Sequence, residues 1–136
     1  MKHRVILSLF LALCMPLTAC SLGSGNTKNV IIDYGTSTLF SEAEIESAVN
    51  TVIAEFSILY GDCKSKLIKI WYDEARFVRG LEAGEAADGN IIVLFTEFTT
   101  GQGFGNPNLT YYDMGWVLIR DDAHSEWSCY SLAKVW

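Results

Sequence analysis

The sequence predicts an α+β domain in which one long helix packs against a curved, four-stranded antiparallel sheet. Three observations predict this class: an apolar stripe recurs at steps of three and four along residues 45–60, strand-forming residues fill four later segments, and no long helical pattern separates the last of these. Short connections favour antiparallel neighbours, and a helix with one apolar face needs a sheet face to cover it. The 136 residues suffice for one domain.

The start of the helix is the clearest local signal. Ser41 can cap the first turn, and Glu44 follows it at the spacing of a capping box. Phe40 and Ile45 flank this cap at the spacing of a hydrophobic staple. Gly61 is expected to end the helix, because glycine readily adopts the conformation that closes one. The stripe that should face the sheet consists of Ile45, Ala48, Val49, Val52, Ile53, Phe56, Leu59 and Tyr60.

The four strands of the predicted sheet follow the helix. Their expected ranges are residues 67–73, 90–98, 114–120 and 126–135. The second holds a solid apolar run, which favours a central position, and a polar turn should join the last two into a hairpin. Three weaker segments remain: 30–32 indicates a short strand or an extended arm, 74–90 a loop with at best a short helix near 75–81, and 99–108 a glycine-rich loop.

The first twenty residues carry a targeting signal. A basic start is followed by an almost entirely apolar run at 5–15 and then by small residues. This order is typical of a secretory signal, and the run is too short for a permanent membrane span of about 20 residues. The end of the signal, Leu17-Thr18-Ala19-Cys20, resembles the lipobox of bacterial lipoproteins. That resemblance implies transfer of diacylglycerol to the Cys20 thiol and cleavage before Cys20.

The expected organisation is a lipoprotein signal peptide at 1–19, a flexible tether at 20–29 and one α+β domain at 30–136. The domain should then be anchored on the extracytoplasmic face of the cell membrane, or in the outer membrane if the organism has one. Each buried methylene of the acyl chains would contribute about 0.8 kcal/mol. With 16 acidic residues against 10 basic ones, two of which leave with the signal, the chain should bind neither nucleic acid nor anionic lipid by its own charge.

Two cysteines remain once the signal and the anchor are set aside. Cys14 lies in the removed segment, which leaves Cys63 and Cys129. An extracytoplasmic location permits a disulfide between them. Two separate buried thiols remain the alternative, because sequence alone does not show that the two Cα atoms lie close together. No cysteine and histidine cluster has metal-ligand spacing, and no cofactor is expected.

A family resemblance rests on several short stretches. A helix followed by strands that end in a tryptophan-bearing hairpin resembles small cystatin-like or NTF2-like domains. More narrowly, the chain is similar to a family of uncharacterised lipoproteins from gut Firmicutes. The matching stretches are 31–35, 40–42, Cys63, 71–72, 96–98, 106–108, Tyr111 and 116–120. The chain departs from this family at its last three residues and in a short, irregular segment at 74–88, and the resemblance implies a fold and a location but no activity.

Most candidate catalytic groups have a simpler explanation. Asp73 and Glu74 are adjacent at a strand end, so they should point to opposite faces rather than share a site, and a solvated strand end is the simpler interpretation. His124 lies in a polar turn with no nucleophile to activate. The glycines at 101–105 lack the helix that follows a dinucleotide-binding loop.

Glu97 and Asp113 are the carboxylates on which an enzyme would depend. Glu97 lies within an apolar strand, and burial against the helix would raise its pKa. The resemblance to NTF2-like domains implies that a carboxylate in the cavity between sheet and helix can abstract protons. Glu97 also lies near the end of its strand, where it can simply reach water.

Aromatic residues give the best lead to a binding site. Trp71, Phe104, Tyr111 and Tyr112 lie on or near the later strands and the glycine-rich loop. Exposed rings stack on sugars and anchor peptides, although rings also fill the cores of small domains. The sequence thus favours a lipid-anchored, non-enzymatic domain that binds a small molecule, a glycan or a protein. The alternatives are the cavity enzyme and a purely structural accessory protein of the envelope.

Overall fold

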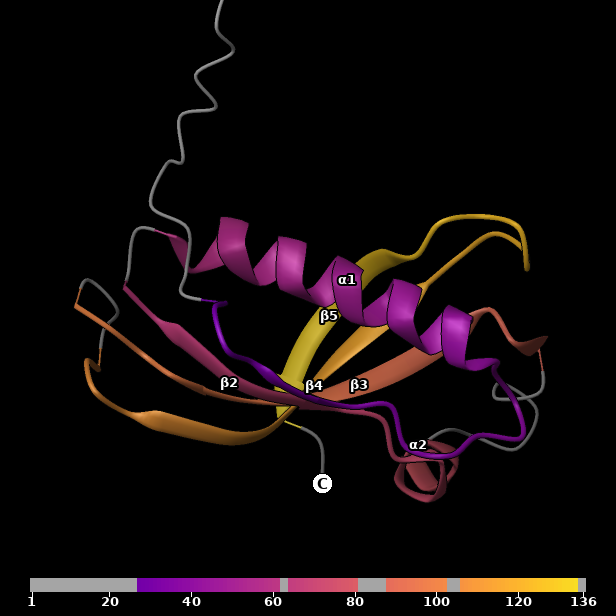
Figure 1. The fold of residues 1–136 in the computed structure, drawn as a ribbon, viewed down its shortest axis with the longest axis horizontal. Helices are drawn as coiled ribbons and strands as arrows, with labels where there is room; N and C mark the ends of the chain where they lie inside the picture. The colour runs from indigo at the N-terminus through magenta and orange to yellow at the C-terminus, as the bar shows by residue number, and fades with distance from the viewer. Residues whose placement is uncertain (1–26, 62–63, 81–87, 103–105, 135–136) are drawn as a thin grey trace, which may run out of the picture.

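The fold combines one sheet with one long helix and one short helix. A computed structural model describes residues 27–61, 64–80, 88–102 and 106–134. The elements are, in order, β1 (Ile31–Asp33), α1 (Glu42–Leu59), β2 (Lys66–Trp71), α2 (Glu74–Gly80), β3 (Ile91–Thr99), β4 (Thr110–Ile119) and β5 (Ser128–Lys134). α1 lies across one face of the curved sheet, and α2 lies beyond the end of β2 (Figure 1). The class is α+β, as the sequence predicts.

The sheet differs from the prediction because it has five strands, in the order β1-β2-β3-β4-β5, and is mixed. β1 pairs in parallel with β2, with Ile31 beside Lys69 and Asp33 beside Trp71, whereas the other three pairings are antiparallel. α1 stands between β1 and β2 and returns the chain to the end where β1 began, so β2 runs parallel to β1. The prediction of four antiparallel strands was wrong because three residues carry too little pattern to distinguish a strand from an extended arm.

The start of α1 confirms the capping box. The Ser41 hydroxyl accepts from the N–H of Glu44 at 3.3 Å, and the N–H of Ser41 donates to the Glu44 carboxylate at 2.8 Å. The helix ends at Leu59, with Tyr60 rather than Gly61 in the capping position. The predicted stripe is buried or partly buried through Phe56 and buried again at Tyr60, but Leu59 is exposed. Leu59 is therefore the one residue of the predicted stripe that projects into solvent.

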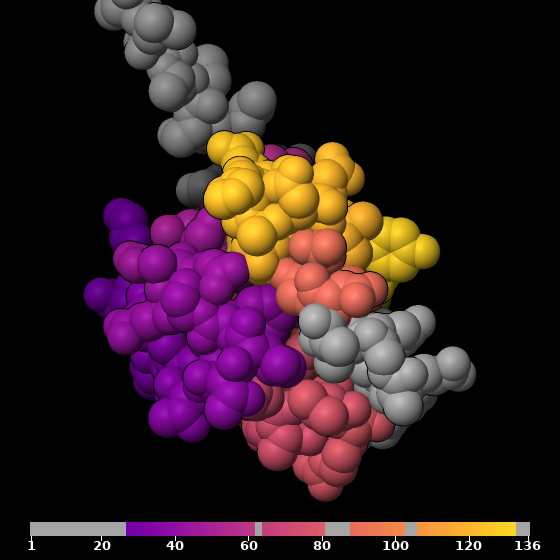
Figure 2. Space-filling view, turned by 90° about the vertical axis from the view of Figure 1, so that its right-hand side faces the viewer, coloured from indigo at the N-terminus to yellow at the C-terminus, as the bar shows by residue number. Residues whose placement is uncertain are grey.

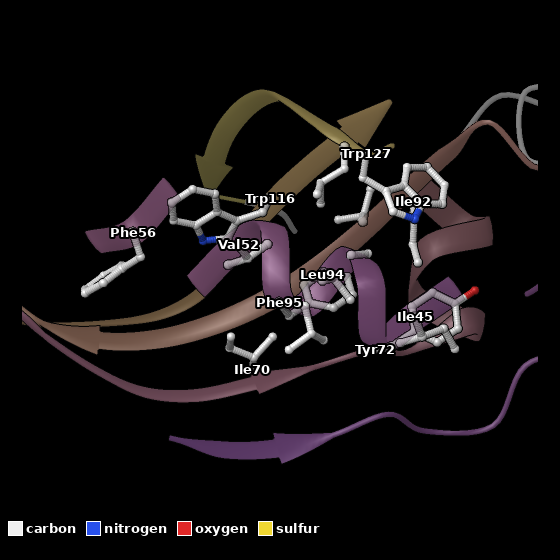
Figure 3. Close-up of a cluster of buried hydrophobic side chains, with 14 of the residues drawn as sticks. Ile45, Val52, Phe56, Ile70, Tyr72, Ile92, Leu94, Phe95, Trp116 and Trp127 are labelled. Atoms are coloured by element: carbon white, nitrogen blue, oxygen red, sulfur yellow. The ribbon is translucent and has the colours of Figure 1, made fainter. Parts of the chain in front are cut away.

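The core lies between α1 and the face of the sheet that α1 covers, here called the inner face (Figure 3). Phe56, Leu94 and Trp116 are fully buried there. The indole N–H of Trp116 donates to the Thr96 hydroxyl at 2.9 Å, and that hydroxyl donates to the Met114 carbonyl at 3.2 Å. The largest core side chain is thus buried with its polar atom paired, which avoids a cost of about 1–3 kcal/mol.

α2 occupies part of a segment for which the sequence allowed a short helix near 75–81. The structure places this helix at Glu74–Gly80. Its Phe77 is buried against the rings of Phe40 and Tyr72, with centroids 6.1 Å apart in both pairs. Isolated helices of this length are marginal in water, so these contacts with other parts of the chain stabilise α2.

β4 contains a bulge and starts at Thr110, earlier than the predicted start at 114. Tyr112 and Asp113 together oppose the single residue Glu97 of β3. Asp113 has a positive φ of 58°, a conformation that aspartate tolerates better than most residues do. Bulges bend a strand and re-aim its side chains, and here the Tyr112 ring is exposed.

Candidate functional site

The structure separates the aromatic residues that the sequence singles out. Trp71 is paired with Phe95 on the outer face of the sheet, which is turned away from α1. Tyr111 lies on the inner face and stacks on Phe98, with centroids 5.2 Å apart. Tyr112 is 61% exposed at the β4 bulge, and Phe104 lies outside the described residues. Trp71 and Tyr111 therefore lie on opposite faces of the sheet, and neither tyrosine lines the groove that contains Trp71.

A groove of about 720 Å³ lies where the chain leaves β1 and β2. One wall is the segment between β1 and α1, and the other is the end of β2 with the start of α2. Figure 2 shows the chain around the start of α1 (indigo to purple) beside α2 (rose). The groove, called the Trp71 groove below, is lined by Asp33, Gly35, Thr36, Ser37, Thr38, Trp71, Tyr72, Asp73, Glu74, Ala75 and Val78.

The carboxylate of Glu74 joins the two walls of the Trp71 groove. It accepts hydrogen bonds from the hydroxyls of Ser37 and Thr38. It also accepts from the backbone N–H groups of Thr38 at 3.0 Å and Leu39 at 3.3 Å, and from the Tyr72 phenol at 3.3 Å. An ionised carboxylate can accept several hydrogen bonds at once, so Glu74 holds this segment against α2.

These contacts set the protonation states in the groove. Burial opposes ionisation of Glu74, but hydrogen bonds from Ser37, Thr38 and Leu39 outweigh it and lower the pKa of Glu74 to about 2. Burial raises the pKa of Tyr72 to about 12, a shift that the Ser37 hydroxyl opposes and the Glu74 carboxylate increases. At neutral pH the groove therefore holds an ionised Glu74 and a neutral Tyr72.

Gly35 lets the segment between β1 and α1, which forms one wall of the groove, approach β2 closely. Gly35 has a φ of 60°, and a Cβ at this position would lie 2.5 Å from the carbonyl oxygen of Tyr72. The N–H of Gly35 donates to the Asp33 carboxylate at 3.0 Å, and the Asp33 carbonyl accepts from the N–H of Tyr72 at 3.1 Å. Because only glycine combines this φ with the absence of a Cβ, Gly35 helps to set the shape of the groove.

Trp71 supplies the aromatic part of the groove. Its ring stacks on Phe95, with centroids 5.9 Å apart, and the Lys69 ammonium lies 5.1 Å from the Trp71 centroid. Phe95 also contacts the guanidinium of Arg76, 4.3 Å from its own centroid. The indole is held in place by these neighbours but is only half-buried. A fixed, partly exposed ring can pack against the apolar face of a ligand.

Glu97 and Asp113, the two carboxylates considered for an enzyme, belong to the outer face. Glu97 alternates along β3 with Thr96 and Phe98, which are on the inner face, and lies beside Lys69 of β2. The Asp113 carboxylate pairs with the Arg76 guanidinium at 2.8 Å. Neither carboxylate is placed in the space between α1 and the sheet, where the resemblance to NTF2-like domains would put it.

The polar atoms of the Trp71 groove are mainly hydrogen-bond acceptors. Asp33, Asp73 and Glu74 contribute carboxylates, and residues 36–38 contribute three hydroxyls. Carboxylates attract cations and accept hydrogen bonds from ligand hydroxyls, and they disfavour anionic ligands. Within the described ranges, no group of three histidine, cysteine, aspartate or glutamate residues could hold a metal ion. The groove thus suits a hydroxyl-rich ligand that is neutral or positively charged.

The cysteine predictions fall mostly outside the described residues. Cys20, the predicted lipidation site, and Cys63, one half of the possible disulfide, are not among them. The Cys129 thiol is half-buried. Burial, with a smaller contribution from the Glu55 carboxylate, raises the pKa of that thiol. Lipidation and the disulfide both stay predictions.

The polar framework of the groove escaped the sequence prediction. The sequence predicts a solvated strand end at Glu74, and it assigns no site role to Gly35, Ser37 or Thr38. A glycine and three hydroxyl residues between a strand and a capped helix are typical of a tight turn. This signal could have identified the first wall of the groove, but not its contact with Glu74.

Comparisons with known proteins identify no relative of this chain. No family model, curated protein or solved structure matches the chain. Neither helix in the described part of the chain is long and apolar enough to cross a membrane. The functional interpretation therefore depends on the residues themselves.

Proposed function

We propose that this protein is a lipid-anchored, extracytoplasmic, non-enzymatic domain that binds a glycan in the Trp71 groove. The observation that carries the proposal is the half-buried Trp71 indole in a groove whose polar atoms are carboxylates and hydroxyls. Sugars present apolar C–H faces that pack on aromatic rings and hydroxyls that donate to carboxylates. The lipobox that ends at Cys20 supports the anchor.

The charge and size of the groove limit the classes of ligand that fit it. Glu74 is ionised above a pH of about 2, and its oxygens already accept from Ser37 and Thr38. The Asp33 and Asp73 carboxylates each accept one backbone N–H, from Gly35 and Arg76, and so keep more acceptor capacity for ligand hydroxyls or amines. A neutral or amino sugar fits such a surface, and an acidic sugar does not. The volume of about 720 Å³ falls within the range of about 300–1,000 Å³ for small-ligand sites.

The cystatin-like or NTF2-like relationship, and the kinship with small gut lipoproteins, belong to the same proposal. A long helix across one face of a curved sheet supports this relationship. β1, parallel to β2, would then be an addition to the four antiparallel strands. The enzyme alternative has no comparable support, because Glu97 and Asp113 belong to the outer face.

Glycan binding is tested with protein purified from membranes, first on an array of neutral, amino and acidic glycans and then by calorimetric titration. Trp71→Ala should weaken binding at least about tenfold, because it removes the ring on which the sugar packs. Thr36→Val should weaken it less. Tyr112→Ala is the matched control, since it removes an exposed aromatic ring that does not line the groove, and it should leave the affinity unchanged.

Two results would contradict glycan binding: a wild-type protein that retains no glycan, or a Trp71→Ala protein that is folded by circular dichroism and binds as well as the wild type. A peptide that binds at Trp71 instead would point to a protein ligand. The anchor is tested separately by feeding cells an alkyne fatty acid. The wild-type protein should be labelled, and Cys20→Ser should not.

A further inference from the structure

One end of the domain gathers the start of the described chain, the end of α1, the end of β3 and the start of β4 (Figure 1). β1 and β2 both begin at this end because they run in parallel. Lys66, the first residue of β2, is beside Thr99 at the end of β3, and Thr99 is beside Thr110 at the start of β4. We call this the proximal end, because it contains the start of the described chain, which is the part nearest in sequence to Cys20. The opposite end is the distal end.

Large apolar side chains project into solvent at the proximal end. Ile58 is 74% exposed and Leu59 56% exposed, and they form the last turn of α1. Leu109 is 44% exposed just before β4, and Tyr112 is exposed near its start. Leu39, Val78 and Ile119 are also exposed at the other end, by 37–46%, but the adjacent Ile58 and Leu59 are more exposed than any of these. Such a pair of adjacent, largely exposed apolar side chains indicates a contact surface. Tyrosine suits a surface that is partly apolar and partly wet.

Lysines accompany these apolar groups. Lys28, Lys64 and Lys66 are all exposed, and all belong to the segments that start β1 or β2. Of the acidic residues near them in the sequence, Asp33 and Asp73 lie at the other ends of β1 and β2, Glu55 is half-buried, and Asp62 lies outside the described residues. The proximal end therefore presents cations together with apolar groups.

The distal end has the opposite charge. Its exposed acidic residues surround the start of α1, the start of β3 and the turn between β4 and β5: Glu42, Glu46, Asp88, Asp121, Asp122 and Glu126. α1 has 18 residues and so is about 27 Å long. This separates the two ends by more than two Debye lengths of about 8 Å. The net charge, −6 for the whole chain and −8 (8 basic against 16 acidic residues) without Lys2 and Arg4 of the signal, therefore does not describe the proximal end.

We infer that the proximal end lies against the anionic surface of the membrane that holds the lipid anchor. This inference rests on the lipidation of Cys20 in the proposed function. The chain from Cys20 to Thr27 can span at most about 25 Å, so an anchor at Cys20 keeps the proximal end close to the lipid headgroups. There the lysines attract anionic headgroups, and the apolar side chains enter the interface.

The same orientation places the Trp71 groove away from the bilayer. The groove is lined by residues that follow β1 and β2, whereas the proximal end is where these two strands begin. A glycan outside the membrane could therefore reach the groove without passing between the domain and the lipid. The acidic distal end is repelled by anionic headgroups, which favours this orientation over the inverted one.

The orientation can be measured by chemical protection of lysines. The lipidated mature protein, which begins at Cys20, is reconstituted into phosphatidylcholine vesicles with or without about 30 mol% phosphatidylglycerol, and acylation of each lysine is followed by mass spectrometry. Phosphatidylglycerol should slow the acylation of Lys28, Lys64 and Lys66 at least about threefold, and about 0.5 M salt should restore it. Lys69, beside Trp71, serves as the internal reference and should change little.

A pair of double variants separates a local charge effect from net charge. Lys64→Gln with Lys66→Gln should abolish the protection of Lys28, because two of the three cations are lost. Arg79→Gln with Asn50→Asp changes the net charge by the same amount at exposed positions elsewhere, and it should retain the protection. Each variant is compared with itself in the two lipid compositions.

Each other outcome has a definite meaning. Equal acylation rates in both lipid compositions, on a protein whose mass shows its acyl chains, would overturn this inference and leave the proposed function intact. Protection of the lysines that does not depend on phosphatidylglycerol but rises with the density of protein on the vesicle would overturn this inference. It would indicate contact between copies of the protein instead. A protein without acyl chains on Cys20 would overturn the anchor and this orientation together, while glycan binding would still be decided by the array.

Discussion

The distal and proximal ends of this domain use their polar side chains in different ways. At the distal end, Glu74 accepts several hydrogen bonds from the chain before α1, and Glu44 pairs with Arg120 at 2.7 Å. The Arg120 guanidinium is nearly buried and lies 4.3 Å from the centroid of Trp127. At the proximal end, apolar and lysine side chains project into solvent instead. The distal polar groups hold the fold together, whereas the proximal side chains face an external surface.

This difference can be tested by stability measurements. Substitutions of the distal contacts should lower the free energy of unfolding, because they remove interactions that exist only in the folded chain. Substitutions of the exposed proximal side chains should leave it nearly unchanged, because those side chains are in water in both states.

Gly35→Ala should have the largest effect. A non-glycine residue at a positive φ costs about 1–3 kcal/mol, and the added methyl group would lie 2.5 Å from the Tyr72 carbonyl oxygen. We expect the free energy of unfolding, measured in urea, to fall by at least about 2 kcal/mol. Gly80→Ala is the control, because a Cβ there meets nothing within 4 Å. Similar losses in both variants would show that the close approach at Gly35 is not the cause.

Glu74→Gln should have an intermediate effect that depends on pH. Folding lowers the pKa of Glu74 from 4.5 to about 2. A group with a lowered pKa stabilises the fold above its unfolded pKa, and this contribution is lost as the pH falls from about 4.5 towards 2. Because Glu74 is partly exposed, the loss at pH 7 in Glu74→Gln should be modest, about 1 kcal/mol.

The check is a comparison of urea midpoints for the wild type and Glu74→Gln between pH 7 and pH 2. The two curves should converge as the pH falls, because the wild type loses the contribution that the variant lacks. Glu44 and Asp122 also have lowered pKa values, mainly through hydrogen bonds from the backbone N–H groups of Ser41 and His124. Both remain in both proteins, so the difference isolates Glu74. Parallel curves would mean that the hydrogen bonds to Glu74 do not lower its pKa.

Ile58→Ser and Tyr112→Ser should have the smallest effects on stability. Both side chains are mostly exposed, so each substitution should change the free energy of unfolding by no more than about 0.5 kcal/mol. On anionic vesicles the same substitutions should reduce the protection of Lys64, since less apolar surface enters the interface. A loss above about 1 kcal/mol in urea would show that the proximal side chains support the fold, and the contrast between the two ends would fail.

The candidate site was only partly predictable from the sequence. Trp71 was singled out, but as one of four aromatic residues that the structure does not place on one surface. Glu74 was interpreted as solvated because its neighbours in the sequence offer it no partner. Its partners, Ser37 and Thr38, lie 37 and 36 positions away, and no local pattern predicts a contact over that distance. The sequence also did not predict the opposite charges of the two ends, because the net charge of a chain does not show which charged residues lie together in the fold.

The sequence by itself determined the α+β class, the capped start of α1 and the apolar β3. These features depend on residues a few positions apart, whose spacing matches the period of a helix or a strand. Only the tertiary structure decided that β1 joins the sheet in parallel, that Glu74 joins the two walls of the groove, and that lysines and apolar side chains share one end. Each of these depends on segments that meet only when α1 has packed on the sheet, so the physical cause is long-range packing rather than local preference.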